Sequence, residues 1–300
     1  MTSFVLVLIG RAGEVEPIAE AVRVVLARID GAEAVWLSRD EACEFPLHVS
    51  DSVAARAMRD RVAAQLNELP VDVCLVPAEG RRKGLLIADM DSTIIEQECI
   101  DEMADVLGLK PRIAAITERA MRGELPFEAA LTERLALLAG LAEGDLQRVF
   151  DERITLMPGA RTLVATMRAA GAFTALVSGG FSFFTSRVAA LVGFDVNRAN
   201  TLEVADGRLT GRVVGPILGR EAKLAALEQY RAERSLAAAA TMAVGDGAND
   251  LAMIKAAGVG VAYRAKPVVA AEAHAGITHG DLTALLYLQG YARSEFVDRG

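Results

Sequence analysis

The sequence predicts an α/β protein with a doubly wound parallel sheet, a helical insertion and a small N-terminal α+β unit. Three observations support this fold class. After residue 158, short apolar runs alternate with helical stretches of about 10–15 residues, the pattern of parallel strands joined by crossover helices. Residues 94–155 have helical periodicity and no strand pattern. A polar stretch at 77–84 separates these regions from the first 80 residues, as a linker does.

The N-terminal unit, residues 1–80, begins with an apolar run that we interpret as a strand. No basic residue precedes this run, and Arg11 follows where a signal peptide would have a small-residue cleavage site. Pro46 and Pro70 mark breaks between the later elements. The predicted strands cover 3–9, 33–38 and 71–76, and the predicted helices cover 14–28 and 51–67.

The larger part, residues 81–300, begins with the aliphatic run 84–88, which predicts a buried strand. Its sheet core is expected at 81–93 and 157–300, with the helical insertion at 94–156 between them. Within the core we expect helices at 160–170, 181–192, 220–234 and 248–256, strands at 172–177, 241–244, 259–262 and 276–278, and a hairpin near 200–214.

Composition excludes several classes of function. The net charge of −8 and the pI near 5.1 disfavour nucleic-acid binding. No apolar run approaches the roughly 18 residues of a membrane span. The three cysteines lie far apart and lack CxxC spacing, which indicates a reducing cytoplasm, and the three histidines have no zinc-ligand spacing with them. These cysteines and histidines are Cys43, Cys74, Cys99, His48, His274 and His279.

The most informative motif is Asp89-Met90-Asp91-Ser92-Thr93, which directly follows the predicted strand 84–88. Ligands of open α/β sheets bind just beyond the carboxyl ends of strands. A carboxylate there can attack phosphorus as a nucleophile, and a second carboxyl two residues on can transfer protons. An Asp-x-Asp pair alone is also common in turns and helix caps, so the pair needs support from other clusters.

Three further polar clusters supply that support. Ser178-Gly179-Gly180 follows the predicted strand 172–177, Lys223 lies near a helix start, and the run 245–250 follows the predicted strand 241–244. Ser178 and the two glycine amides can hold phosphoryl oxygens, and Lys223 adds positive charge. Each cluster alone could be a turn or a solvated side chain, but their joint order favours one site at one edge of the sheet.

The run 245–250, Gly-Asp-Gly-Ala-Asn-Asp, supplies the remaining groups of this site. Asp89 and Asp246 offer hard oxygen ligands, which suit Mg²⁺. Such an ion would reduce the repulsion between a carboxylate nucleophile and a phosphate. Asp250 is expected one helical turn beyond Asp246, where it can orient a ligand, and Asn249 offers an amide donor to the substrate.

The DxDST, SGG, Lys and GDGxND series over residues 80–290 resembles the haloacid-dehalogenase-like phosphotransferase superfamily and, within it, the phosphoserine phosphatase family. The resemblance implies Asp89 as nucleophile, Asp91 as general acid and base, and Mg²⁺ held by the Asp89 carboxylate, the Asp91 carbonyl and Asp246. Gly180 and Asp250 would support these groups. The βαββαβ pattern of residues 1–80 resembles the ACT-type regulatory domains that accompany some members.

The helical insertion, the cap of this family, carries the expected substrate contacts. Glu98 matches the glutamate that meets the substrate ammonium, and Arg134 matches the arginine that meets its carboxylate, a partner that suits the planar guanidinium. Met121 and Phe127 would cover the substrate with apolar surface. The resemblance therefore implies O-phosphoserine as a small-molecule substrate, and a homodimer is possible. Without it, Glu98 and Arg134 would be interpreted as exposed helix residues, and Met121 and Phe127 as core.

Two alternatives remain open. The chain could act on another small phosphomonoester or pass the phosphoryl group to an alcohol, or it could be a non-catalytic sensor that binds a cation and an amino acid. A dinucleotide-dependent oxidoreductase is disfavoured because no Gly-x-Gly-x-x-Gly motif opens the first helix.

Overall fold

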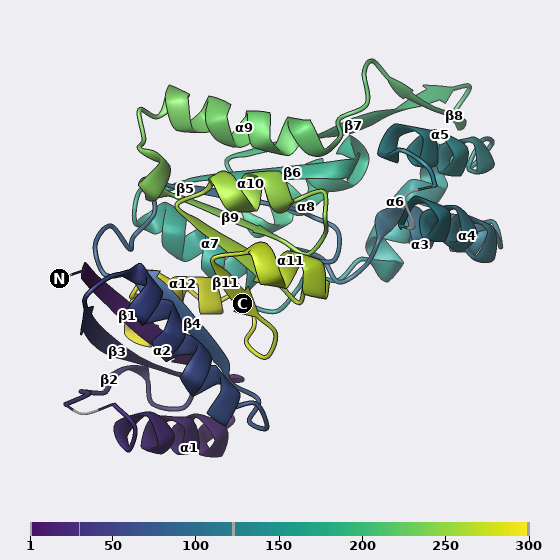
Figure 1. Cartoon of the computed structure of the whole chain (residues 1–300). Coiled ribbons are helices and arrows are strands. Elements are labelled where there is room, and N and C mark those ends of the chain that lie inside the picture. Colours follow the sequence, from purple (N-terminus) through teal and green to yellow (C-terminus); the bar gives the residue numbers. More distant parts are fainter. Residues whose placement is uncertain (1, 30, 122–123, 299–300) are drawn as a thin grey trace. The chain divides into compact units, whose positions relative to one another are not determined.

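The computed structural model of the chain describes residues 2–29, 31–121 and 124–298, with the backbone alone for Thr2 and Met121 (Figure 1). These residues form two compact units. One consists of Met1–Ile87, Pro158–Thr174 and Leu227–Gly300, and the other of Ala88–Met157 and Ala175–Ala226.

The N-terminal residues form an antiparallel sheet with strand order β2-β3-β1-β4 and two helices. The element order βαββαβ is the ferredoxin-like arrangement. Side chains of the sheet and of both helices, such as Leu6, Ile18, Phe45 and Val62, share one core. The elements are β1 (Thr2–Ile9), α1 (Val15–Leu26), β2 (Val35–Ser38), β3 (Ala42–Val49), α2 (Ser52–Gln65) and β4 (Asp72–Pro77).

Strand β3 corrects one expectation, because it contains Pro46, which the sequence analysis takes as a break. Proline has no N–H to donate to a sheet ladder, so it is confined to positions whose outer side is unpaired. The short strand β2 pairs only with Ala42, Cys43 and Glu44 of β3. Pro46 faces Val5 of β1 and lies beyond the end of β2, so it costs no bond on that side.

The second sheet has seven strands in the order β11-β10-β9-β5-β6-β7-β8, which confirms the doubly wound α/β fold class. The pairs β9/β10, β10/β11 and β6/β7 are parallel, and β7/β8 is the expected hairpin. The chain order reverses between β5 and β9, which makes that position the topological switch point where such sheets bind ligands. The strands are β5 (Leu85–Ala88), β6 (Phe173–Phe181), β7 (Val196–Ala205), β8 (Arg208–Val214), β9 (Thr241–Gly245), β10 (Val259–Tyr263) and β11 (Ala275–Ile277).

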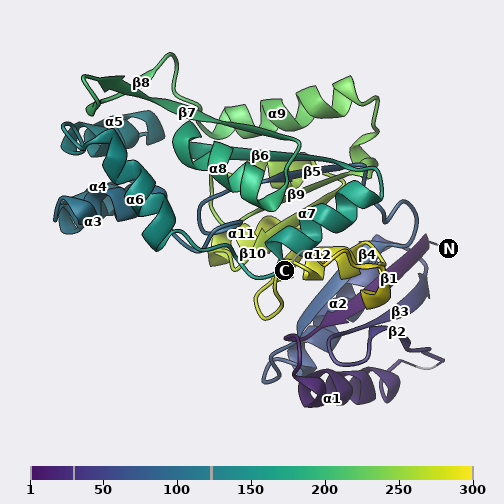
Figure 2. The ribbon, with the colours of Figure 1, turned by 180° about the vertical axis from the view of Figure 1, so that it is seen from behind.

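The insertion after β5 is helical, as expected, and no strand occurs in its described residues 94–121 and 124–156. Figure 2 shows its helices α3 (Cys99–Val106), α4 (Lys110–Met121), α5 (Phe127–Leu137) and α6 (Glu143–Arg153). The remaining helices are α7 (Ala160–Ala169), α8 (Ser182–Val192), α9 (Arg220–Glu233), α10 (Leu251–Ala256), α11 (Pro267–Glu272) and α12 (Ala284–Leu288), with 3₁₀ turns at Ala238–Ala240 and Arg293–Glu295. The sequence analysis does not assign α11 and α12.

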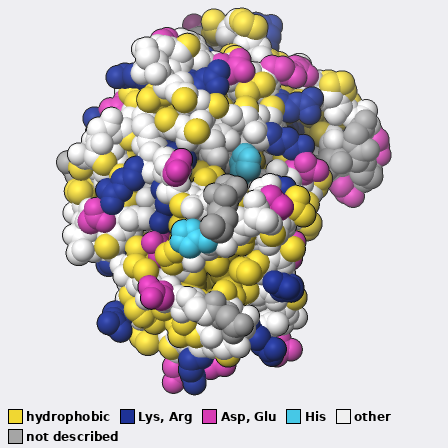
Figure 3. Space-filling view, turned by 60° about the vertical axis from the view of Figure 1, so that its left-hand side comes forward, with side chains coloured by type: hydrophobic (Ala, Val, Ile, Leu, Met, Phe, Trp, Pro, Cys, Tyr) yellow, Lys and Arg dark blue, Asp and Glu magenta, His cyan; other side chains and the backbone are white. Residues whose placement is uncertain are grey.

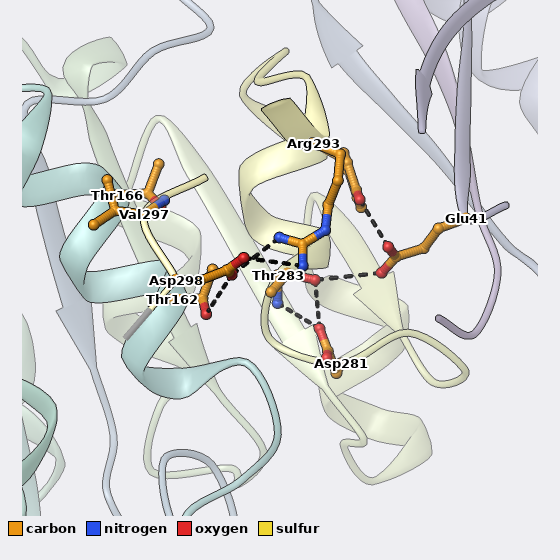
Figure 4. A network of polar contacts seen from close by, with 9 residues as sticks. Glu41, Thr162, Thr166, Asp281, Thr283, Arg293, Val297 and Asp298 are labelled. Atoms are coloured by element: carbon orange, nitrogen blue, oxygen red, sulfur yellow. Dashed lines mark hydrogen bonds and ion pairs between the residues drawn. The ribbon is translucent and has the colours of Figure 1, made fainter. Parts of the chain in front are cut away.

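Within the first unit, polar side chains join the N-terminal sheet to the C-terminal segment (Figure 4). Glu41 is 5% exposed and accepts hydrogen bonds from the hydroxyls of Tyr287 and Thr283 at 2.8 and 3.4 Å. Arg293 donates to both carboxylate oxygens of Asp298, which ties the chain end to its own 3₁₀ turn. Burial raises the pKa of Glu41, and the hydrogen bond from Tyr287 opposes this.

Basic and acidic side chains are interspersed on the face of the molecule in Figure 3, with no large field of one sign. A mixed surface of this kind offers no continuous basic groove for a nucleic-acid backbone. Among the described residues, no helix is both long enough and apolar enough to cross a membrane.

Candidate active site

Asp89 follows β5 and lies almost entirely out of solvent, at 5% exposure. All four residues of β5 are buried, which fixes the direction in which the chain leaves the sheet. The Lys223 ammonium, near the start of α9, lies 2.7 Å from Asp89 Oδ1, and the Met90 N–H donates to the same oxygen at 2.8 Å. Because both charged side chains are buried, their attraction is screened little by water. The pair holds a carboxylate in a fixed orientation.

Asp91 is held from both sides by hydrogen bonds. The backbone N–H of Cys99 donates to Oδ1 at 2.9 Å, and the Ser178 hydroxyl donates to Oδ2 at 3.2 Å. Burial raises the pKa of Asp91, and the negative charge of Asp89 raises it further, while these hydrogen bonds oppose both effects. A carboxyl with a raised pKa keeps its proton to higher pH, as a general acid must.

The turn between the two aspartates and the cap is tightly wound. The Met90 carbonyl accepts backbone hydrogen bonds from residues 93, 94 and 95. Ser92 has φ 55°, a left-handed conformation that is uncommon for a residue other than glycine. The Ser92 hydroxyl donates to Glu98 Oε1 at 2.9 Å. Local strain of this kind is tolerated where the surrounding structure fixes it, and here it accompanies the Asp-x-Asp pair.

The Ser178-Gly179-Gly180 motif corrects a second expectation, because β6 continues through it to Phe181. The register between β6 and β7 shifts between Val177 and Phe181, so the motif lies in an irregularity of the strand and not in a loop after it. The Gly180 N–H donates to Ser178 Oγ at 2.8 Å. A Cβ on Gly180 would lie 2.8 Å from Asp91 Oδ2, so a side chain there would displace the carboxyl.

One of the cap residues predicted to contact the substrate, Phe127, lies near this motif. Phe127 begins α5, and its ring would be 3.2 Å from a Cβ on Gly179. Arg134, also on α5, donates to the Ala130 carbonyl at 3.2 Å and to the Thr117 hydroxyl at 3.4 Å. The side chain of Met121 lies outside the described residues.

The electrostatics around Arg134 link it to the acidic residues of the same unit. Burial lowers the pKa of the guanidinium, and the carboxylates of Glu98, Asp101 and Asp91 oppose this, in that order. Burial likewise raises the pKa of Asp101, and Arg134 and Lys110 oppose it. Arg134 and Glu98 therefore form part of one charged region with the Asp-x-Asp pair.

The run 245–250 begins at the last residue of β9 and forms a turn. The Gly247 N–H donates to Asp250 Oδ2 at 3.1 Å, and Asp250 is fully buried. Helix α10 begins only at Leu251, so the expected helix from 248 is wrong at its start. Asp246 and Asp250 therefore lie in one turn and not one helical turn apart on α10. The Asp250 carboxylate accepts a hydrogen bond from the backbone of that turn. Asn249 is partly buried in this turn.

One group of acidic side chains among the described residues could hold a metal ion. Asp246 and Asp250, both in the turn that follows β9, each offer one carboxylate oxygen, and these two atoms lie within 4.8 Å of each other. A set of carboxylate oxygens is the donor set that a hard divalent cation prefers. The residues present therefore fit a divalent metal.

Three residues near the site were not found from the sequence. Cys99 holds Asp91 through its backbone, Thr117 contacts Arg134, and Asn200 donates to the Gly179 carbonyl at 2.8 Å. A backbone contact and a helix-surface threonine leave no sequence signal. Asparagine is depleted in strands, so Asn200 within the expected hairpin was a signal that could have been used.

Comparisons with known proteins agree with this geometry. The family model described as haloacid dehalogenase-like hydrolase matches residues 86–255, a range that contains the Asp-x-Asp pair, the cap, Lys223 and the 245–250 turn. The chain belongs to the haloacid dehalogenase-like hydrolase family.

Members of this hydrolase family with similar sequences include proteins named phosphoserine phosphatase. The one from Streptomyces coelicolor is 40% identical over 283 residues, which cover 92% of this chain and 69% of that protein. The one from Idiomarina loihiensis is 47% identical over 203 residues, which cover 68% of this chain and 92% of that protein. Among solved structures, a HAD family hydrolase from Salmonella enterica serovar Typhi has a TM-score of 0.83 at 32% identity and covers 96% of this chain and 98% of that one.

Proposed function

We propose that this protein is a magnesium-dependent phosphoserine phosphatase, which hydrolyses O-phospho-L-serine to L-serine and phosphate through an aspartyl-phosphate. The observation that carries the proposal is the arrangement of the buried Asp89–Lys223 pair and the partly buried Asp91 beside the Ser178 motif. The names of the similar proteins support the same substrate.

In the first step, an Asp89 oxygen attacks phosphorus and the bond from phosphorus to the serine oxygen breaks. Asp91 donates its proton to the leaving alkoxide, for which the raised pKa of this carboxyl suits it. In the second step, Asp91 takes a proton from water, the water oxygen attacks phosphorus, and the acyl phosphate bond to Asp89 breaks. One carboxyl thus cycles one proton, and phosphate leaves.

Lys223, Ser178 and the amides of Gly179 and Gly180 would hold the phosphoryl oxygens. A lysine ammonium supplies a point positive charge, and glycine lets backbone N–H groups approach an anion closely. The Asp89 carboxylate, the Asp91 backbone carbonyl and Asp246 would hold Mg²⁺, with Asp250 and Gly180 in support. When bound, the ion would neutralise charge that develops on the phosphoryl group. Asn249 would donate its amide to the substrate.

The charges of the cap match an amino-acid substrate. Glu98 would meet the ammonium and Arg134 the carboxylate, and Phe127 and Met121 would cover the bound molecule. Glu98 accepts a hydrogen bond from Ser92, and Arg134 donates to Thr117 and to the carbonyl of Ala130 in its own helix. A zwitterion would offer both side chains charge-assisted hydrogen bonds, which are stronger than these neutral ones.

The substrate assignment can be tested with an Arg134→Ala variant. We expect kcat/KM for phosphoserine to fall by about 10² or more, because a charged hydrogen bond to the substrate carboxylate is lost. Hydrolysis of p-nitrophenyl phosphate, which has no carboxylate, should change far less. Arg119→Ala is the matched control, because Arg119 lies on α4 of the cap and is ion-paired to Glu133 at the surface.

Three results would reject parts of this proposal. An unchanged kcat/KM for phosphoserine in Arg134→Ala would favour another small phosphomonoester as the substrate. If incubation of the protein with phosphoserine and Mg²⁺ releases no phosphate, with or without a chelator, the result would favour a cation and amino-acid sensor. Formation of the phosphate ester of an added alcohol, in place of inorganic phosphate, would indicate phosphoryl transfer.

The remaining parts of the proposal concern the N-terminal residues and the compartment. The division into residues 1–80 and 81–300, with a cap at 94–156, and the ACT-like role of the first part are proposals that the βαββαβ order supports. An ACT-like unit could join two copies in a homodimer, which light scattering would measure. Cys43, Cys74 and Cys99 are all free and buried, which fits a reducing cytoplasm.

A further inference from the structure

Asn200 is a buried polar side chain that the reaction scheme does not use. It lies on β7, directly opposite Phe181 of β6, and is 3% exposed. Strands β6 and β7 run side by side here (Figures 1 and 2). Both ends of the Asn200 amide are bonded to backbone: Nδ2 donates to the Gly179 carbonyl at 2.8 Å and to the Leu218 carbonyl at 3.4 Å. Oδ1 accepts from the Leu218 N–H at 2.7 Å.

These bonds join two segments that carry different parts of the proposed site. Gly179 is the middle residue of the motif whose Ser178 hydroxyl bonds Asp91. Leu218 lies just before α9, the helix whose Lys223 pairs with Asp89. The Asn200 side chain is thus bonded both to the motif that contacts Asp91 and to the segment that leads to Lys223, the partner of Asp89. It thereby fixes the spacing between these two segments.

The surroundings show that this spacing is tight. The Phe127 ring would lie 3.2 Å from a Cβ on Gly179 and 3.5 Å from a Cβ on Gly219. The Leu218 carbonyl would lie 3.9 Å from the same Cβ on Gly179. The two segments and the cap phenylalanine are therefore close neighbours, and Asn200 supplies polar bonds between the two segments.

We propose that Asn200 is a positioning residue that sets the distance between the phosphoryl-binding motif 178–180 and the Lys223 segment. This proposal rests on the proposed phosphatase function only for the catalytic roles given to the motif 178–180 and to Lys223. Charge stabilisation of a transferring phosphoryl group depends on donors being in place before reaction. Loss of the amide bonds should therefore lower kcat more than it raises KM.

The kinetic test uses two variants of the full-length protein with Mg²⁺ and whichever phosphoester the wild type hydrolyses best. Asn200→Asp keeps the size and the acceptor for the Leu218 N–H but loses both donated bonds, and Asn200→Ala loses all three. We expect kcat to fall by about 10-fold to 10²-fold in both, with KM changed by less than about threefold. A folded Asn200→Asp variant with wild-type kcat would overturn the proposal.

Asn197→Ala is the matched control. Asn197 lies on the same strand, opposite Leu176 of β6, and accepts hydrogen bonds from the Thr185 and Ser186 hydroxyls of α8, at 3.0 and 3.3 Å. Its kcat should remain near that of the wild type. An equal loss of kcat in this control would assign the effect to β7 as a whole and overturn the proposal.

Hydrogen exchange separates this proposal from the proposed function. In Asn200→Ala, amide exchange of residues 178–180 and 218–220 should accelerate together, whereas that of β9 should not, whether or not phosphoserine is a substrate. Unchanged exchange at both segments would contradict the role. If both Asn200 variants fail to fold, the residue serves the fold as a whole and the local role is rejected.

Discussion

Buried carboxylates occur in two regions of the molecule, and their partners differ. At the start of β4, Asp72 is 6% exposed and accepts backbone hydrogen bonds from Thr278, His279 and Gly280. At the end of β5, Asp89 is 5% exposed and has the Lys223 ammonium and one N–H as partners. Burial alone therefore does not distinguish the two.

The pKa shifts of Asp72 and Asp91 do not distinguish the two regions either. Burial raises the pKa of Asp72, and its hydrogen bonds from the backbone of 278–280 oppose this. Burial also raises the pKa of Asp91, next to Asp89. The difference lies in the neighbours. Asp72 closes a loop of its own unit through backbone donors, whereas Asp89 and Asp91 lie beside a second carboxylate, a lysine and a glycine-rich motif. Catalysis requires such a cluster of titratable groups and hydrogen-bond donors.

The largest expected effect is that of Asp89→Asn. An amide cannot attack phosphorus, so kcat for phosphoester hydrolysis should fall by at least about 10³-fold to 10⁴-fold. Steady-state phosphate release measures this. The matched change in the other region, Asp72→Asn, should leave kcat within about twofold of the wild type. If both variants lose activity equally, the distinction between the two regions is wrong.

Asp91→Asn should have the next largest effect. Loss of the general acid and base is expected to lower kcat by about 10²-fold to 10³-fold while the Asp89–Lys223 pair persists. A leaving group that needs no protonation, such as p-nitrophenolate, should restore part of the first step. Equal losses for phosphoserine and p-nitrophenyl phosphate would argue against the acid role.

Gly180→Ala should reduce kcat by about 10-fold to 10²-fold, because its Cβ would lie 2.8 Å from Asp91 Oδ2 and 3.0 Å from Ser178 Oγ. Gly144→Ala is the control, since a Cβ at Gly144 in α6 meets nothing within 4 Å. That control should keep full activity and gain about 0.5–1 kcal/mol of stability from the better helix former. A fully active Gly180→Ala enzyme would mean that Asp91 is not held as described.

Asp72→Asn should have the smallest effect, a loss of about 1–2 kcal/mol in the free energy of unfolding, because an amide cannot accept all of its backbone bonds. The pKa of Asp72 is raised in the folded protein. The protonated Asp72 therefore contributes to the free energy of unfolding. This contribution is complete at pH values below the pKa of the residue in the unfolded chain, and it is lost as the pH rises through its pKa in the folded protein.

Urea unfolding of Asp72→Asn and the wild type at several pH values measures this contribution. The stability gap between the variant and the wild type should narrow as the pH rises above about 4, the unfolded pKa of an aspartate. If this difference in stability instead widens as the pH rises, the backbone hydrogen bonds stabilise the ionised carboxylate of Asp72, which contradicts its raised pKa.

Much of the fold was predictable from local patterns. The alternation of short apolar runs with helices identified the parallel sheet, and the long helical block identified the cap. The expected βαββαβ order includes strand β3, but its bounds were not predicted because Pro46 is a break in most contexts, and only the length of β2 makes this proline acceptable. The short helices α11 and α12 carry too few residues for a periodic signal.

For the site, the sequence determined which chemical groups the chain carries: the two aspartates after β5, the Ser178 motif, Lys223 and the acidic turn after β9. Short spacing and strand ends suffice for this, because they are local properties. Only the tertiary structure decided that Ser178 bonds Asp91, that Lys223 pairs with Asp89, and that Asn200 joins their segments. These contacts link residues far apart in the chain, and their geometry depends on the sheet register and the packing of buried side chains.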